Sequence, residues 1–353
     1  MKKQRGAAIF LCLCAILFLS ACNESESGET AKHPPLSMTR DDLLGTVVTL
    51  TAYGDADEAA LESAFRVIED IDARMSANAE SSEIFLLNRQ SDGAKEDGFA
   101  VSRDIYDLTK RAAEISGLSA GAFDPALGGV TELWKANGEF ASLPSEEEIL
   151  SRIDAAHFQN ILFLPGSRIA FAEPGVKLDL GGIAKGYACD KAVASLAKDG
   201  AKSALLDLGG NIYALGKKPG GSDWKVGIAV PYAGESGVAC SIPVTDRAVV
   251  TSGGYQRFFE KDGQTYHHIL DPATGYPAES DLLSATVIGR SSADADGFST
   301  ACFVLGRENG MALIESVPGY EAILIAKDER VYATPGIAGQ IEILDERFRL
   351  EET

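Results

Sequence analysis

The chain is organised around the stretch Val176-Lys-Leu-Asp-Leu-Gly-Gly-Ile-Ala-Lys-Gly-Tyr-Ala-Cys-Asp-Lys-Ala-Val193. Residues 176–180 alternate as strands do. The two glycines that follow have no Cβ, so they let the backbone approach a ligand closely. Helical spacing of apolar residues begins at Gly186. Because the first N–H groups of a helix are unpaired, a strand, a glycine turn and a helix start can together cradle a phosphate or diphosphate.

Two charged residues of this stretch are candidate site residues. Lys185 is expected at the rim of the cradle, and Asp179, at the end of the strand, could hold a hydroxyl, a ring N–H or a metal-bound water. The alternative is a plain strand-to-helix connection whose glycines only relieve crowding. The pattern matches neither the dinucleotide fingerprint nor the phosphate loop of nucleoside triphosphatases, so neither of those sites is predicted.

Charge excludes two classes of partner. The 353-residue chain carries a formal net charge of −20, whereas nucleic acid binding needs Lys and Arg to displace counterions from phosphates. The same charge argues against docking on anionic lipid by electrostatic attraction. The hydrophobic content of 45% is that of a folded, soluble body.

The amino end is predicted to be a lipoprotein signal. Lys2, Lys3 and Arg5 precede an apolar run over residues 7–19, which is the order and length of a secretion signal. The run is short for a membrane span. It ends Leu-Ser-Ala-Cys22, similar to a bacterial lipobox, so we expect residues 1–21 to be removed and Cys22 to carry lipid. The alternative is a plain secretion signal.

The remaining cysteines predict no framework of cross-links. Cys189, Cys240 and Cys302 stand apart and in no C-x-x-C pair, so a disulfide network and a zinc site are not expected. We expect them to be small buried residues.

The mature chain is predicted to be one α+β domain. Residues 22–38 form a lipid anchor and flexible tether, rich in polar residues up to about Pro35. Residues 39–350 mix strands and helices without strict alternation and without an internal linker, which favours a single interleaved domain of mixed sheets and flanking helices. Helical spacing predicts helices over residues 58–75, 102–118, 145–153 and 293–305.

An acid and a hydroxyl lie on one face of the last predicted helix. Asp296 and Thr300 are four residues apart, hence one turn apart. Both offer hard oxygen ligands, which suit Mg²⁺ with water and phosphate oxygens completing the coordination. The alternative is a helix cap or a solvated face.

His267 and His268 are adjacent in a predicted strand over residues 264–270, so only one of them can face a cleft. A histidine there could take a proton from a hydroxyl nucleophile, although a lone histidine is more often structural.

Eight segments, in order, resemble the ApbE family, the FAD:protein FMN transferases. They are Leu-Gly-Thr46; Met75-Ser76 with Ser82-Glu-Ile84 and Leu87-Asn88; Gly121-Ala-Phe-Asp-Pro125; Leu178 to Tyr187; Asp207-Leu-Gly-Gly-Asn211; Thr251-Ser-Gly253 with Tyr255; His268-Ile-Leu-Asp-Pro-Ala-Thr-Gly275; and Ala295-Asp-Gly-Phe-Ser-Thr300. Each is weak alone, but together they span residues 44–300.

The resemblance implies an activity and a site. A member binds FAD, cleaves its diphosphate with Mg²⁺, joins FMN to a Thr or Ser hydroxyl of a client protein and releases AMP. By the same resemblance, Asp296 and Thr300 match metal ligands, Gly182 matches a carbonyl ligand, and His268 matches the proposed general base, with Asp296 also assigned to catalysis. Positions matching the FAD site are Leu44, Asn78, Ala122, Phe123, Asp124, Asp179, Lys185 and Leu270.

One position departs from the family pattern. Asn78 stands where members usually have an aromatic residue, and a ring there could stack on the nucleotide with about 1–3 kcal/mol, by analogy with base stacking. Hydrolysis of FAD to FMN and AMP, alone or beside transfer, is therefore a second hypothesis. A third is a flavin-binding lipoprotein without turnover.

The resemblance also implies partners and a location. Expected clients are FMN-carrying subunits of membrane electron-transfer complexes or other extracytoplasmic flavoproteins. The protein is expected on the extracytoplasmic, periplasmic side of a bacterial membrane, held by its lipid alone.

Overall fold

The computed structural model describes residues 34–54, 56–90, 97–136 and 139–351. The predicted signal over residues 1–21, Cys22 and the tether as far as residue 33 lie outside this part of the chain. Strand β1 begins at Leu36 and pairs with β2 as far as Leu43. Residues 36–38, predicted to be tether, therefore belong to the folded body, because their backbone groups are paired in a ladder.

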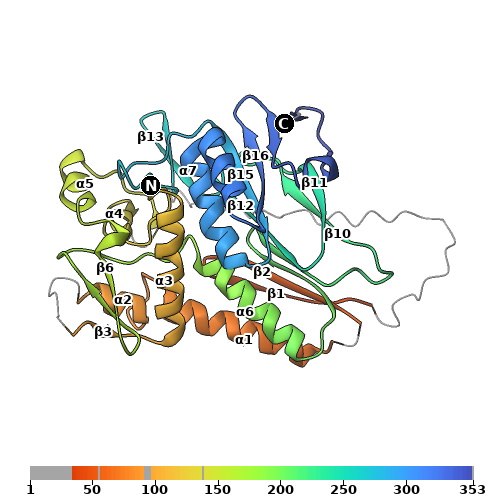
Figure 1. The fold of residues 1–353 in the computed structure, drawn as a ribbon, viewed down its shortest axis with the longest axis horizontal. Coiled ribbons are helices and arrows are strands. Elements are labelled where there is room, and N and C mark those ends of the chain that lie inside the picture. The colour runs from red at the N-terminus through yellow and green to blue at the C-terminus, as the bar shows by residue number, and fades with distance from the viewer. Residues whose placement is uncertain (1–33, 55, 91–96, 137–138, 352–353) are drawn as a thin grey trace, which may run out of the picture.

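A nine-stranded sheet forms the centre of the described protein, in the order β1-β2-β8-β9-β12-β15-β16-β17-β19 (Figure 1). All of its ladders are antiparallel except the short one between β17 and β19. The strands are β1 (Leu36–Leu43), β2 (Thr46–Tyr53), β8 (Ser203–Leu208), β9 (Asn211–Leu215), β12 (Arg247–Gly253), β15 (Leu282–Gly289), β16 (Glu321–Ala326), β17 (Arg330–Ala333) and β19 (Arg349–Leu350).

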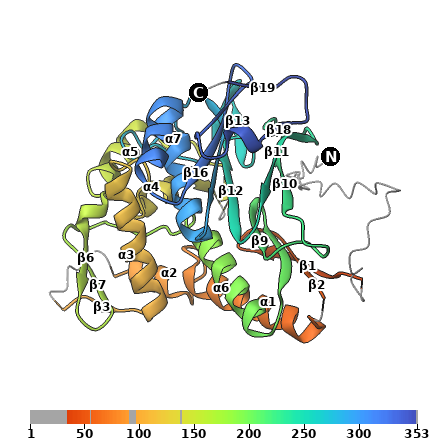
Figure 2. The same ribbon diagram turned by 45° about the vertical axis from the view of Figure 1, so that its right-hand side comes forward.

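Helices cover one face of this sheet. Helix α1 (Glu58–Met75) lies along α6 (Ala184–Lys198), α6 contacts α7 (Ser292–Ser316), and α3 (Arg103–Leu118) packs beside α7 (Figures 1 and 2). The apolar residues of α1 at positions 61, 65, 68, 71 and 75 are all buried here, as the spacing predicts. The shorter helices are α2 (Glu83–Asn88), α4 (Gly128–Leu133), α5 (Glu146–Ile153) and the 3₁₀ turns Phe158–Asn160 and Ala338–Gln340.

The opposite face of the sheet carries a second apolar core. Side chains of β10 (Trp224–Ala229) and β11 (Val238–Val244) pack there against Val249, Ile288, Ile323 and Ile325 of the main sheet. Because successive strand residues point to opposite faces, one sheet serves both cores, and the predicted α+β class is confirmed. The remaining strands are β18 (Glu342–Ile343) beside β11, the ribbon β13 (Phe258–Lys261) with β14 (Gln264–His267), the sheet β3 (Phe99–Ala100), β7 (Arg168–Phe171) and β6 (Ile161–Leu164), and the pair β4 (Lys135–Ala136) with β5 (Glu139–Phe140).

Residues 176–180 do not form the predicted strand. Their only ladder contact is an isolated bridge between Lys177 and Leu127. Loops supply the hydrogen bonds instead: the Asn88 amide pairs with both backbone groups of Leu178, and the Asp179 N–H donates to Pro125. The alternation arises because one side of this extended segment is buried, not because a strand lies beside it.

Two further boundaries differ from the predictions. Strand β14 ends at His267, so His268 to Leu270 follow the ribbon instead of continuing it. Helix α7 runs on to Ser316 through a kink at Gly306, whose φ of 74° is open to glycine at little cost. The three cysteines Cys189, Cys240 and Cys302 are free and buried, as predicted.

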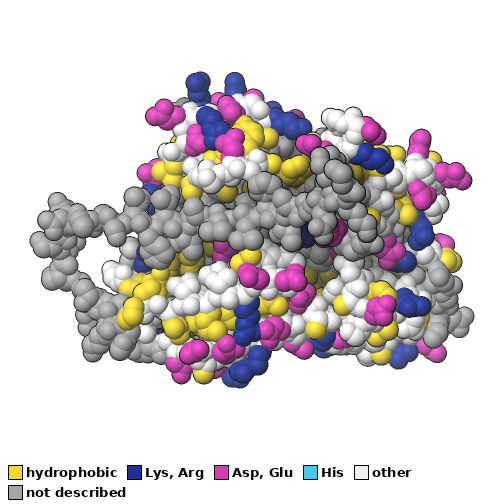
Figure 3. Space-filling model, turned by 180° about the vertical axis from the view of Figure 1, so that it is seen from behind, with side chains coloured by type: hydrophobic (Ala, Val, Ile, Leu, Met, Phe, Trp, Pro, Cys, Tyr) yellow, Lys and Arg dark blue, Asp and Glu magenta, His cyan; other side chains and the backbone are white. Residues whose placement is uncertain are grey.

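The surface mixes charges of both signs. The face in Figure 3 carries acidic and basic side chains interspersed with small apolar areas. None of the helices in the described residues has the length and apolarity needed to cross a membrane.

Candidate functional site

The glycine bend of residues 181–186 lies against the first turns of α7. A Cβ added at Gly186 would come within 2.1 Å of the Ser292 carbonyl oxygen, so the two helices approach as closely as backbones allow. This approach brings the Gly186 N–H to Asp296, whose Oδ2 accepts its hydrogen bond at 3.0 Å. The sequence predicted the glycine bend and the acidic residue of α7 separately, and the close contact of α6 with α7 brings them together.

Asp296 is buried and fully engaged. Its residue surface is 2% exposed, and its Oδ1 lies 3.3 Å from Nζ of Lys185. A buried carboxylate needs such compensation, because burying an unpaired charge is costly. Lys185 was predicted at the rim of the cradle, and it stands there as the counter-ion of Asp296.

Gly182 makes room next to Thr300. A Cβ built on Gly182 would lie 3.6 Å from Oγ1 of Thr300 and 3.0 Å from the ring of Phe123. A side chain at position 182 would thus fill the space in front of the Thr300 hydroxyl. The bend and the acid–hydroxyl pair of α7 form one cradle, as the sequence predicted.

The donor set of this cradle fits a hard divalent cation. Asp296 contributes a carboxylate and Thr300 a hydroxyl, and the glycine bend lies beside both, through the Gly186 N–H at Asp296 and through Gly182 next to Thr300. Within the described residues no three His, Cys, Asp or Glu side chains cluster as a metal site. A cation here would therefore depend on few protein ligands, which is the way Mg²⁺ is commonly held when substrate phosphates and waters complete its shell.

Lys135 links two predicted site residues that are distant in sequence. Its Nζ donates to Oδ1 of Asn78 at 3.4 Å and lies 3.9 Å from Oδ2 of Asp179. Asp179 also caps its own turn, because its Oδ1 accepts from Gly181 N–H at 2.8 Å. Lys135 gave no sequence signal, since it belongs to a two-residue strand outside every motif.

Hydrogen bonds to the buried Asp124 carboxylate hold the loop that carries Ala122, Phe123 and Asp124. All three residues are buried, and Asp124 accepts hydrogen bonds from Ala126 N–H at 2.8 Å and Phe158 N–H at 2.9 Å. Burial raises the pKa of Asp124 to about 6, although both hydrogen bonds oppose the rise. The Asp124 carboxylate shapes the loop, and Phe123 is the member that reaches Gly182.

His268 is oriented by a backbone carbonyl. Its Nδ1 lies 3.1 Å from the Arg257 oxygen, and a carbonyl only accepts, so the proton is on Nδ1 and the Nε2 lone pair is free. Burial lowers the pKa of His268 to about 3, helped by the charges of Arg257 and Lys185. The residue as a whole is half-buried, and its pKa lies well below 7. It is therefore neutral at physiological pH.

Arg257 ties His268 to the β1–β2 turn. Its Nη2 donates to the Gly45 carbonyl at 2.6 Å while its own carbonyl holds His268. Leu44, predicted to line the FAD site, precedes Gly45 and has a φ of 53°, a conformation uncommon outside glycine. Arg257 was not predicted, because nothing in the sequence connects it to residue 45.

The other two residues near this point are packed inside. The ring of His267 packs edge-on against Phe303, with 5.5 Å between the ring centres. Leu270 is buried with Trp134 and Val130 in a small aromatic core. Because β14 ends at His267, the two histidines do not share a strand, and the prediction that they face apart stays a prediction.

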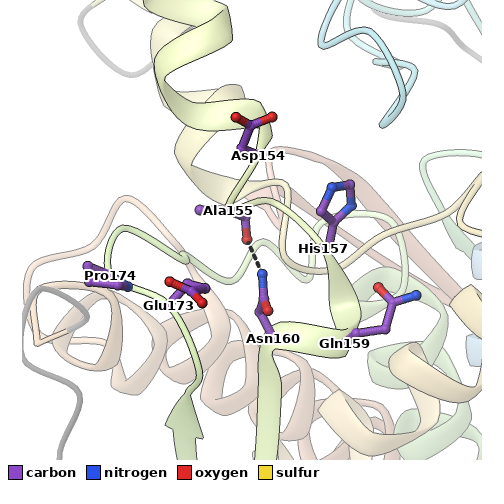
Figure 4. A pocket seen from close by; sticks show the side chains of 7 residues that line it. All are labelled: Asp154, Ala155, His157, Gln159, Asn160, Glu173 and Pro174. Carbon is purple, nitrogen blue, oxygen red and sulfur yellow. Dashed lines mark hydrogen bonds between the residues drawn. The ribbon is translucent and has the colours of Figure 1, made fainter.

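A separate hollow of about 630 Å³ lies beside the 3₁₀ turn Phe158–Asn160 (Figure 4). Asn160 donates to the Ala155 carbonyl across it at 3.1 Å. Its lining residues are Asp154, Ala155, His157, Gln159, Asn160, Glu173 and Pro174. None of these is a predicted site residue, and we assign this hollow no role.

The fold defines an α+β protein with mixed sheets and flanking helices, in which a glycine bend meets the first turns of α7. The chain belongs to the ApbE family, whose family model matches residues 44–324.

The chain is similar to several relatives over most of their length. The chain is 38% identical to the FAD:protein FMN transferase of Treponema pallidum, over 88% of this chain and 90% of that one. It is 33% identical to the FAD:protein FMN transferase of Klebsiella pneumoniae, over 82% and 89%. The crystal structure of the ApbE protein of Thermotoga maritima matches with a TM-score of 0.76 and 31% identity, covering 88% of this chain and 97% of that one.

Proposed function

We propose that this protein is an FAD:protein FMN transferase that uses Mg²⁺, acts on a Thr or Ser hydroxyl of a client flavoprotein and releases AMP. The observation that carries the proposal is the contact of the glycine bend with α7, which sets Gly182 beside Thr300 and Gly186 on Asp296. The names of its relatives support flavin transfer as the activity.

The reaction balances as a phosphoryl substitution. The client hydroxyl oxygen forms a bond to the FMN phosphorus, the bond from that phosphorus to the bridging oxygen breaks, and AMP leaves with that oxygen. The hydroxyl proton would go to Nε2 of His268, which is free because Nδ1 donates to Arg257. The negative charge of a bound diphosphate would raise the low pKa of this imidazole and so strengthen it as a base. Such transfers depend on alignment and charge neutralisation more than on covalent help.

Asp296, Thr300 and the Gly182 carbonyl would hold the cation. When bound, Mg²⁺ supplies positive charge to the diphosphate oxygens. Lys185 already places one positive charge at this point, 3.3 Å from Asp296. The buried ring of Phe123 lies next to Gly182.

Hydrolysis of FAD to FMN and AMP is the second candidate, and Asn78 favours it. Its exposed amide is paired with Lys135 and offers no ring for stacking. A loosely held nucleotide gives water more access as acceptor. We expect Asn78→Tyr to slow AMP release in the absence of a client and to increase product retention. Unchanged values of both would remove the reason for this alternative.

One incubation distinguishes the functions. The protein is mixed with FAD, Mg²⁺ and a candidate client, and client and nucleotides are weighed by mass spectrometry. Transfer adds FMN to the client, and hydrolysis gives FMN and AMP with the client unmodified. FAD that survives overnight would leave only the flavin-binding lipoprotein, which has no use for Asp296 or His268.

Two variants separate the roles inside the site. Asp296→Ala should abolish every form of FAD cleavage, because the cation that would neutralise the diphosphate loses its carboxylate ligand. His268→Ala should reduce transfer to a client more than hydrolysis, since water needs a base less than a positioned hydroxyl does. Equal loss of both activities in His268→Ala would contradict its role as base.

The proposed setting is the periplasmic side of a bacterial membrane, with the protein held by lipid on Cys22. The order of charge, apolar run and cysteine in residues 1–22 supports it. Proposed clients are FMN-carrying subunits of membrane electron-transfer complexes. Retention in the membrane fraction, lost in Cys22→Ser, tests the anchor.

A further inference from the structure

Three hydroxyl groups form a buried chain behind the cradle. Oγ of Ser252, on β12, lies 3.3 Å from Oγ1 of Thr300 and 2.8 Å from Oγ of Ser299, both on α7. Oγ of Ser299 in turn donates to the Asp296 carbonyl at 2.9 Å. Ser252 is 9% exposed and Ser299 is fully buried, so neither hydroxyl exchanges its partners for solvent freely.

The direction of every hydrogen bond in this chain follows from its last member. The Asp296 carbonyl has no proton, so Ser299 must donate to it. Since each hydroxyl has one proton, the contact between the serines then uses the proton of Ser252. That leaves Ser252 as an acceptor toward Thr300, and the Thr300 hydroxyl must be the donor.

This polarity determines what Thr300 presents to the cradle. Its single proton points back to Ser252, so its remaining lone pairs are directed away from the chain of hydroxyls, and Gly182, which has no side chain, lies next to this hydroxyl. A hydroxyl is a cation ligand through its lone pairs, and a proton aimed at the cation would oppose binding. Outer partners that orient ligands in this way affect metal affinity without touching the metal.

We propose that Ser252 and Ser299 are positioning residues which fix the Thr300 hydroxyl as a lone-pair donor and so set the affinity of the cradle for a divalent cation. This rests on the cation site of the proposed function. Ser299 acts on Thr300 through Ser252. If Ser299 no longer accepts the hydroxyl proton of Ser252, Ser252 can donate to Thr300 instead and occupy the lone pair that the cation needs.

The test measures cation binding directly. Mn²⁺ is titrated into the protein with saturating AMP, and free Mn²⁺ is followed by electron paramagnetic resonance. We expect Ser252→Ala and Ser299→Ala each to raise the Mn²⁺ dissociation constant about 10-fold, at the lower end of outer-partner effects. In Mg²⁺-dependent FAD cleavage, the half-saturating Mg²⁺ concentration should rise by a similar factor while kcat at saturating Mg²⁺ recovers.

Thr286→Val is the matched control. Thr286, on β15, shares a hydroxyl contact of 2.8 Å with Thr251, the neighbour of Ser252 on β12, and this contact includes neither Ser252, Ser299 nor Thr300. This substitution removes one buried hydroxyl, as each serine variant does, so it should lower thermal stability by a similar amount. The Mn²⁺ dissociation constant should stay within 2-fold of the wild-type value. Ser252→Thr keeps a hydroxyl at this position, so it should bind Mn²⁺ more tightly than Ser252→Ala and close to wild type.

The outcomes separate this inference from the function it rests on. If Asp296→Ala loses Mn²⁺ binding but both serine variants bind as tightly as wild type, the positioning role is refuted and the cation site stands. If wild type itself binds no Mn²⁺ with AMP, or Asp296→Ala binds normally, the cation site is refuted and the positioning role falls with it. If Thr286→Val weakens Mn²⁺ binding as much as the serine variants do, the serine effect reflects a general loss of stability, and the positioning role is refuted.

Discussion

A single methyl group at Gly186 tests the contact on which the site depends. In Gly186→Ala the new Cβ would lie 2.1 Å from the Ser292 carbonyl oxygen and 2.7 Å from Cα of Ala293. Ordinary contacts begin at 3.4 Å, so α6 and α7 must separate by 3.4 − 2.1 = 1.3 Å at this point. Both neighbours are backbone atoms, which cannot swing away as a side chain would.

The cost has two parts. Forcing an extra methyl into a packed interior costs about 1–3 kcal/mol. The separation also stretches the 3.0 Å hydrogen bond from Gly186 to Asp296, and bonds to charged groups are worth about 1.5–3 kcal/mol. We expect the free energy of unfolding to fall by about 2–5 kcal/mol when these terms overlap in part.

Gly117→Ala is the control for the same substitution in another helix. Gly117 lies in α3, where the nearest atom to an added Cβ is a ring carbon of Phe158 at 4.0 Å. With room for the methyl, alanine should stabilise the helix by about 0.5–1 kcal/mol. Urea denaturation followed by circular dichroism gives both values, and FAD cleavage is measured on the folded variants below their transitions.

The two variants should therefore move in opposite directions. Gly186→Ala should be destabilised and should cleave FAD poorly even where it is folded, because Asp296 is displaced from the bend. Wild-type stability with wild-type cleavage in Gly186→Ala would refute the reasoning, since it would show that the helix contact neither is tight nor positions the acid.

Three further predictions concern charges around the site. In the folded protein the pKa of His268 is about 3, below its ordinary 6.5, so this histidine contributes stability that is present above pH 6.5 and lost as pH falls toward 3. Urea denaturation between pH 7 and 4 should show that the free energy of unfolding falls more steeply with decreasing pH in wild type than in His268→Gln. Asp124 has the opposite pH dependence. Its pKa is raised from 3.8 to about 6 in the folded protein, so it contributes stability that is present below pH 3.8 and lost as pH rises through 6. Between pH 4 and 7, the free energy of unfolding of Asp124→Asn should therefore increase relative to that of wild type, and a difference that stays constant with pH would contradict the raised pKa. Arg257→Met removes the hydrogen bond to Gly45 and should raise the KM for FAD more than it lowers kcat, as steady-state kinetics would measure.

Local order was readable from the sequence because it depends on neighbours along the chain. The helix over residues 58–75 has the bounds that its apolar spacing predicts, and Asp296 and Thr300 share one face of α7 because four residues make about one turn. The glycines at 181 and 182 marked a bend for the same reason. The family's order of motifs then predicted which residues belong to one site.

Tertiary structure decided how those residues meet. Gly186 and Asp296 are 110 residues apart, and their contact depends on where the sheet carries α6 and α7. Lys135 reaches Asn78, and Arg257 reaches Gly45, through loops whose sequences carry no mark of these partners. The extended segment 176–180 read as a strand because burial, not pairing, sets alternation. Periodicity records which side of a segment is buried, whereas the identity of the partner is fixed only when distant segments pack together.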